Sequence, residues 1–157
     1  MGWLQPKTDW TASDYFNASD YNRIVGNVLY LEELSVATIG TLDFYQMTQE
    51  KYHLQLLYAD EMNKIKQNVE LLNVYDFQTT LKTCSDNGTF LNYTDLNKLE
   101  ALIYTLYITM RSQVSFLKRL SFRLGNKFSV PRQVEEDYST ELYRLAYILE
   151  DETEVKS

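Results

Sequence analysis

A five-residue pattern occurs three times in this chain of 157 residues, and it constrains the fold more than any other feature. Each copy reads acidic, apolar, asparagine, basic, aliphatic, and the copies cover residues 20–24, 61–65 and 95–99. The first and third copies also share the residues that precede them, 15–19 and 90–94. Repetition of this kind is typical of one small structural unit used several times. It favours a packing or assembly protein over a protein built around a single catalytic pocket.

Two copies of the pattern have the sequence of a helix beginning. Asn17 and Asn92 stand at expected N-cap positions, where an asparagine side chain accepts hydrogen bonds from unpaired backbone N–H groups. Asp20 and Asp95 follow at the position that completes a capping box, and their charge suits the positive end of the helix dipole. We therefore predict a structural role for the motif residues, which are Asn17, Asp20, Asn22, Arg23, Asn63, Lys64, Asn92, Asp95, Asn97 and Lys98.

Three asparagines also fit the glycosylation pattern Asn-x-Ser/Thr, namely Asn17, Asn87 and Asn92. Helix capping is the preferred interpretation of Asn17 and Asn92, and Asn87 followed by Gly88 is typical of a turn. The asparagines inside the pattern, Asn22, Asn63 and Asn97, lie beside apolar positions. We predict that their side chains hydrogen-bond to the backbone of an adjacent connection; the alternative is that they face water.

Apolar residues at three- and four-residue spacing predict helices. The expected helices cover about residues 18–37, 59–75, 93–124 and 132–150, whereas residues 39–57 fit no class clearly. The expected fold is all-α. It is a bundle of about four helices built from degenerate helix-start repeats (residues 17–150), with an extended N-terminal arm (1–16) and an acidic tail (151–157).

The third expected helix has an apolar seam of about four heptads and a length of about 48 Å. Shorter partner helices would leave part of this seam open, and exposed apolar stripes mark subunit contacts. We therefore predict a homo-oligomer or a subunit of a larger particle. The two tryptophans of the arm should dock on this bundle or on a neighbouring subunit. The candidate interface residues are Trp3, Trp10, Tyr104, Tyr107, Met110, Phe116 and Leu117.

Charge is distributed unevenly along the chain. The formal net charge of −7 argues against general nucleic-acid binding, and no apolar stretch is long enough to span a membrane. Residues 101–134 contain basic residues and no acidic ones, whereas residues 135–157 are strongly acidic. Three interpretations remain. The last helix can pack antiparallel on the third, or the charges can form a docking surface for another subunit. Phosphate binding by the basic stripe is a more distant third.

No catalytic, metal or cofactor site is predicted. Glu50 and His53 have the Glu-x-x-His spacing of di-iron helical bundles, but such a site needs two of these motifs and His53 is the only histidine. Cys84 is the only cysteine, so it forms no disulfide within the chain. We expect a protein that is not an enzyme.

The segments Pro6-Lys7-Thr8-Asp9-Trp10, Asp14-Tyr15-Phe16-Asn17 and Asp20-Tyr21-Asn22-Arg23-Ile24 together resemble a segment found in tail, baseplate and fibre proteins of phages of Gram-positive bacteria. Residues 57–65 resemble a second segment of those proteins, without the proline that precedes it there, and Val25 replaces their usual glutamate.

This resemblance implies a virion component of the tail, made in the host cytoplasm, that binds other virion structural proteins and helps to attach fibre or receptor-binding parts. The alternative is a small intracellular helical adaptor or a phage-encoded inhibitor of a host protein.

Overall fold

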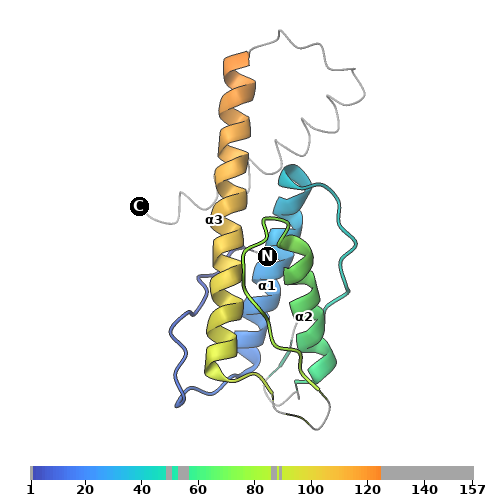
Figure 1. Ribbon diagram of the computed structural model, residues 1–157, viewed down its shortest axis with the longest axis vertical. Coiled ribbons are helices and arrows are strands. Elements are labelled where there is room, and N and C mark those ends of the chain that lie inside the picture. Colours follow the sequence, from blue (N-terminus) through green and yellow to red (C-terminus); the bar gives the residue numbers. More distant parts are fainter. Residues whose placement is uncertain (1, 49–50, 53–56, 86–87, 89, 125–157) are drawn as a thin grey trace.

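The computed structural model describes residues 2–48, 51–52, 57–85, 88 and 90–124, with side chains as far as Lys118. The described residues form three helices and no strand: α1 (Ala18–Thr38), α2 (Ala59–Leu72) and α3 (Tyr93–Leu124). The three helices lie side by side, and all begin at the lower end of the molecule in Figure 1. The expected all-α class is confirmed. The expected fourth helix, residues 132–150, lies outside the described residues.

Capping explains where α1 and α3 begin. The side chain of Asn17 accepts hydrogen bonds from the N–H groups of Ser19 and Asp20, and the carboxylate of Asp20 accepts one from the N–H of Asn17 at 3.1 Å. Asn92 and Asp95 exchange the same two bonds, at 2.9 and 3.1 Å. The predicted capping boxes at these two helix starts are confirmed.

The second helix differs from its expected form at both ends. Its N-cap is Tyr58, which has no side-chain capping bond, although the carboxylate of Glu61 accepts the N–H of Tyr58 at 3.1 Å. The helix ends at Leu72, short of the expected Tyr75. The side chain of the next residue, Asn73, bonds to the backbone of Phe77, and such local bonds compete with helix continuation.

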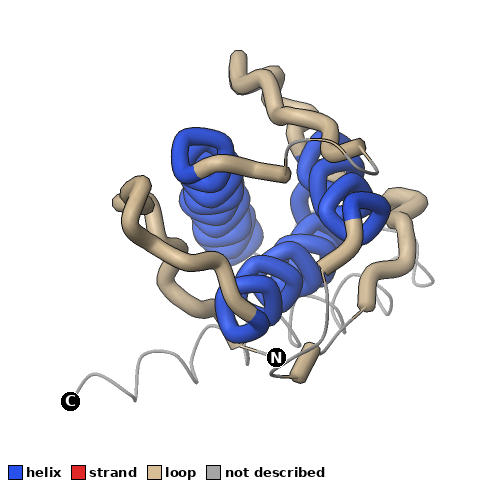
Figure 2. Tube along the Cα trace, turned by 90° about the horizontal axis from the view of Figure 1, so that it is seen from below, coloured by secondary structure: helices blue, strands red, loops and turns tan. Residues whose placement is uncertain are grey.

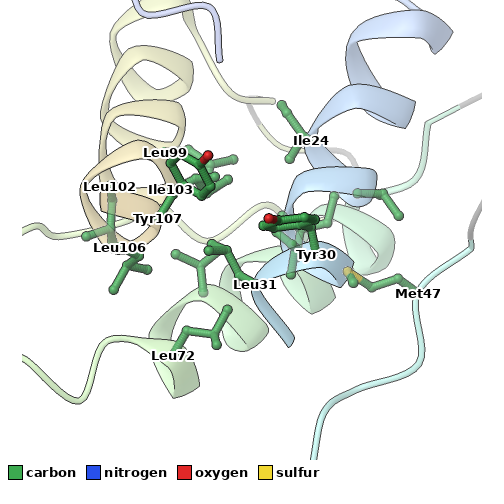
Figure 3. Close-up of a cluster of buried hydrophobic side chains, with 14 of the residues drawn as sticks. Ile24, Tyr30, Leu31, Met47, Leu72, Leu99, Leu102, Ile103, Leu106 and Tyr107 are labelled. Atoms are coloured by element: carbon green, nitrogen blue, oxygen red, sulfur yellow. The ribbon is translucent and has the colours of Figure 1, made fainter. Parts of the chain in front are cut away.

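The hydrophobic core lies between the three helices, each of which contacts the other two. Figure 3 shows Leu31 of α1, Leu72 of α2 and Leu106 of α3 within one cluster of buried side chains. Trp10, Met47, Leu81 and Cys84, all from non-helical segments, are also buried. The arm and the connections therefore complete the core as well as joining the helices.

The arm and both connections run opposite to the helices. The two connections descend from the upper ends of α1 and α2 towards the start of the next helix, and the arm descends from about mid-height towards the start of α1 (Figure 1). Seen from below, these loops lie around the periphery of the three helices (Figure 2). The helices are consequently parallel to one another, which requires a long return segment between successive helices.

Candidate functional site

Six asparagines of the described chain bind backbone in one way, which we call an asparagine clamp. The side-chain Oδ1 accepts the N–H of one residue, and Nδ2 donates to the C=O of that same residue. All twelve distances lie between 2.8 and 3.0 Å. The clamps are Asn22–Lys51, Asn27–Leu4, Asn63–Cys84, Asn68–Tyr45, Asn73–Phe77 and Asn97–Trp10.

The clamps satisfy backbone groups that have no strand partner. An extended residue exposes both an N–H and a C=O, and burying either group without a partner is costly. Asparagine carries one acceptor oxygen and a donor NH₂, so a single side chain pairs with both groups. The hydrogen bonds predicted for Asn22, Asn63 and Asn97 are confirmed, because each joins a helix to an adjacent segment.

Two clamps from different helices hold the N-terminal arm. Asn27 of α1 holds Leu4, and Asn97 of α3 holds Trp10. The arm is therefore attached to both helices. Its tryptophans dock on the chain's own bundle, one of the two alternatives expected from the sequence.

The connection between α1 and α2 is held in the same manner. Asn68 of α2 holds Tyr45, and Asn22 of α1 holds Lys51. Tyr45 and Lys51 have the same spacing in the chain as Leu4 and Trp10. This connection is the segment that the sequence could not classify.

The described part of the connection between α2 and α3 has one clamp made by a residue within a helix, in which Asn63 of α2 holds Cys84. The corresponding second position, on α3, is occupied by the buried Leu102. The clamp between Asn73 and Phe77 lies at the start of this connection instead.

Sequence reasoning missed the clamps of Asn27, Asn68 and Asn73. A signal for two of them was present. Residues 22–27 and 63–68 both read asparagine, basic residue, isoleucine, two further residues, asparagine. The third copy of the pattern lacks the second asparagine because Leu102 replaces it.

The carboxylate of Glu100 forms the centre of a buried polar cluster on α3, and the residue is only 1% exposed. It accepts hydrogen bonds from the N–H of Lys7 at 2.7 Å and from the indole Nε1 of Trp10 at 2.9 Å. Arg23 of α1 pairs with the same carboxylate at 2.8 Å and with Asp20 at 2.8 Å. Glu100 thus connects the arm, α1 and α3 at one point.

Charge in this cluster is compensated. Burial by itself lowers the pKa of Arg23, but the carboxylates of Glu100 and Asp20 outweigh burial and the net pKa is raised. Arg23 is a motif residue, and its role is now clear. Glu100 was not singled out from the sequence, although an acidic residue between the apolar positions Leu96, Leu99 and Ile103 was a signal for it.

A second buried ion pair joins Lys51 to Glu61 at 2.8 Å. Burial tends to raise the pKa of Glu61, but the bonds from Lys51, from the Tyr58 N–H and from Thr48 outweigh burial and lower it. The charge of Glu61 therefore stabilises the connection that the clamp of Asn22 also holds.

The candidate interface residues divide into two groups. Trp10, Tyr107 and Met110 are buried in the chain's own core, and Trp3 stacks on Tyr107 with ring centroids 3.9 Å apart. These four belong to the fold as described. The other three remain at the surface of α3: Tyr104 is 38% exposed, Phe116 60% and Leu117 41%.

Three further tyrosines are exposed where the helices begin. Tyr15 precedes α1 and is 90% exposed, Tyr58 caps α2 and is 58% exposed, and Tyr93 opens α3 and is 44% exposed. All three helices begin at the same end of the molecule (Figure 1). Tyrosine is enriched in protein interfaces, so this aromatic end is a candidate contact surface.

The described side chains offer little chemistry beyond these contacts. They contain no group of three or more His, Cys, Asp or Glu positioned to hold a metal ion, and Glu50 and His53 lie outside the described residues. Cys84 is buried, and burial raises the pKa of its thiol, which disfavours the reactive thiolate. None of the helices found in the described ranges is both long and apolar enough to cross a bilayer.

Comparisons with known proteins identify no relative. No family model, curated protein or solved structure matches this chain.

Proposed function

We propose that this protein is a structural subunit of a phage tail or baseplate that acts through contacts with other virion proteins. One observation carries the proposal. The residues that resemble phage tail proteins, including Trp10, Asp20, Asn22 and Arg23, are those that hold the arm, α1 and the following connection together. A motif that fixes a scaffold suits a building block more than an enzyme.

We also propose that the fold is built from copies of one unit, an extended descending segment followed by an ascending helix. The same number of residues separates Trp10 from Lys51 and Asn22 from Asn63. The equivalent clamps at these positions support common construction. A fourth helix at residues 132–150 is part of this proposal and rests on the spacing of its apolar residues.

The aromatic end of the bundle supports the assembly role. Tyr58 occupies an N-cap position where asparagine would form a better cap, as Asn17 and Asn92 do. An exposed aromatic residue at a position where it weakens the fold is consistent with selection for binding. Tyr15 and Tyr93 present the same chemistry nearby. In the proposed assembly these tyrosines, with Tyr104 of α3, contact neighbouring virion subunits, including further copies of this chain.

The test is incorporation into particles. Phage particles from the encoding genome would be purified and their proteins identified by mass spectrometry, for the unaltered chain and for a Tyr15→Ser/Tyr93→Ser variant. We expect the unaltered chain in the particles and the variant depleted from them. Val36→Ser, which removes an exposed apolar side chain near the other end of α1, is the matched control and should be incorporated normally.

A monomer by light scattering that never copurifies with particles would refute the proposal. Binding of such a monomer to one host protein would favour an adaptor or inhibitor.

A further inference from the structure

The apolar seam of α3 loses its cover within the described part of the helix. Successive seam residues are buried as far as Val114, whereas Leu117, the next one, is exposed. The buried seam residues are Leu99, Ile103, Leu106, Met110 and Val114. Figure 1 shows why, because α3 projects beyond the upper ends of α1 and α2. The seam therefore continues where these two helices no longer reach it.

The sequence extends this seam to the end of the helix. Leu120 and Leu124 follow Leu117 at three- and four-residue spacing, and α3 runs to Leu124. At 1.5 Å per residue, this part of α3 is about 10 Å long. Residues 117–124 of α3 thus continue the leucine seam for about two helical turns, and covering them requires a partner of similar length.

We propose that this seam is covered by residues 132–150 of the same chain, packed antiparallel to α3. Residues 125–131 separate this segment from α3 in the sequence, and their number is one that commonly joins neighbouring helices. Residues 132–150 carry apolar residues at helical spacing, and their first half is long enough to cover the open seam. These apolar residues are Val134, Tyr138, Leu142, Leu145 and Leu149.

Charge favours this occupant over a second copy of α3. The upper part of α3 carries Lys118, Arg119 and Arg123, with no acidic residue from position 101 to 134. Two copies of α3 packed in parallel would bring these like charges together, which is unfavourable. Residues 135–137 are Glu-Glu-Asp and lie in the half of the segment that would face the basic turns.

Disulfide trapping in the full-length chain tests the proposal. The variant Leu117→Cys/Tyr138→Cys, at positions that face each other in this arrangement, would be made in a Cys84→Ala background, oxidised with copper phenanthroline and analysed by non-reducing electrophoresis and mass spectrometry. We expect one disulfide within each chain, with a yield that does not depend on protein concentration. Thr105→Cys/Tyr138→Cys is the matched control, because Thr105 is exposed on another face of α3, and it should not cross-link.

Two outcomes would overturn the proposal. Disulfides between chains through Leu117→Cys would show that a second copy of the chain covers the seam. Failure of this variant to cross-link at all would show that the seam is covered by neither residues 132–150 nor a second copy. The charge argument has its own control. Reversing residues 135–137 to lysine should reduce the cross-linking yield several-fold, whereas reversing Glu150, Asp151 and Glu152 should change it little. Equal effects would refute the charge argument. These results do not depend on whether the protein belongs to a particle.

Discussion

Asn22 and Lys51 lie 29 residues apart in the chain, yet one amide side chain pairs with both backbone groups of the lysine, at 2.9 and 2.8 Å. The ammonium of Lys51 in turn pairs with Glu61, near the start of α2. A single residue of an irregular connection is thus fixed to α1 through its backbone and to α2 through its side chain. This arrangement explains how a connection whose described residues form no helix or strand keeps a defined path between two helices.

Removing one clamp should destabilise the protein measurably. Asn63→Ala leaves the N–H and C=O of the buried Cys84 without their side-chain partner. We expect a loss of about 1–3 kcal/mol in the free energy of unfolding, measured by urea denaturation. Gln67→Ala, on the exposed face of the same helix, should change it by less than about 0.5 kcal/mol. Equal effects of the two substitutions would contradict the structural role of the clamp.

Neutralising Glu100 should loosen the arm. Glu100→Gln keeps the size of the side chain but leaves Arg23 with Asp20 as its remaining carboxylate in this cluster. Breaking a buried ion pair typically costs about 3 kcal/mol or more, and we expect a value near this lower limit. The fluorescence of the tryptophans should change as well, because the indole of Trp10 donates to this carboxylate. Glu70→Gln removes a half-exposed carboxylate and is the control; a similar loss there would exclude a special role for Glu100.

Acid should weaken the Lys51–Glu61 pair. The pKa of Glu61 in the folded protein is lowered from its ordinary value of 4.5. The unfolded state therefore binds the proton more readily than the folded state. The stabilisation by the ionised Glu61 is present above about pH 4.5 and is lost as the pH falls through the lower pKa that Glu61 has in the folded protein. We expect Glu61→Gln to be less stable at neutral pH and to lose less stability on acidification.

Glu32 provides a control of opposite sign for this pH dependence. Burial, with a further contribution from Glu33, raises the pKa of Glu32, so its ionisation opposes folding. Glu32→Gln should therefore steepen the fall in stability in acid. Parallel pH profiles for Glu61→Gln and Glu32→Gln would contradict both assignments.

A better cap at the start of α2 should stabilise the fold. Tyr58→Asn introduces the residue type found at the other two helix starts, and we expect a gain of about 1 kcal/mol. The gain is offset in part by loss of the contact between Lys51 and the Tyr58 ring, whose centroid lies 5.6 Å from the ammonium. Asn17→Ala, measured in the same thermal denaturation assay, should lose about 1 kcal/mol. No stabilisation by Tyr58→Asn would remove the argument that Tyr58 is kept for binding.

Two residues of α3 that looked alike in the sequence should now behave differently. Met110→Ala opens a cavity in the core and should cost about 2–5 kcal/mol, whereas Phe116→Ala should cost less than about 0.5 kcal/mol because its ring is largely exposed. Chemical denaturation of both variants checks this. A large loss for Phe116→Ala would mean that residues outside the described part of the chain bury this ring.

Local signals predicted the helices, and they did so best where capping was strong. The starts of α1 and α3 follow from Asn17 and Asn92, and α3 has the bounds expected from its seam. The end of α2 was predicted too late because apolar spacing alone does not reveal that Asn73 turns back on Phe77. The spacing of apolar residues carries no information about a single polar side chain that ends a helix.

The paths of the arm and the connections could not be predicted for a different reason. These segments have no period of their own, since residues far away in the sequence set their conformation. The repeated asparagines did predict contacts with adjacent segments, but the sequence does not say that Trp10 is the partner of Asn97. Glu100 was missed because its partners, Lys7, Trp10 and Arg23, come from two other parts of the chain.

The parallel arrangement of the helices has a consequence for how the chain folds as it is synthesised. The arm leaves the ribosome before the three helices, but the partners of Trp10 are Asn97 and Glu100, which lie 87 and 90 residues further along. Until α3 has been made, Trp10 lacks Asn97 and Glu100, and Trp3 lacks the ring of Tyr107, so both indoles remain available to chaperones or to a neighbouring chain. Closing such long loops is slow compared with forming single helices. A segment translated before all three helices is thus among the last to reach its native position.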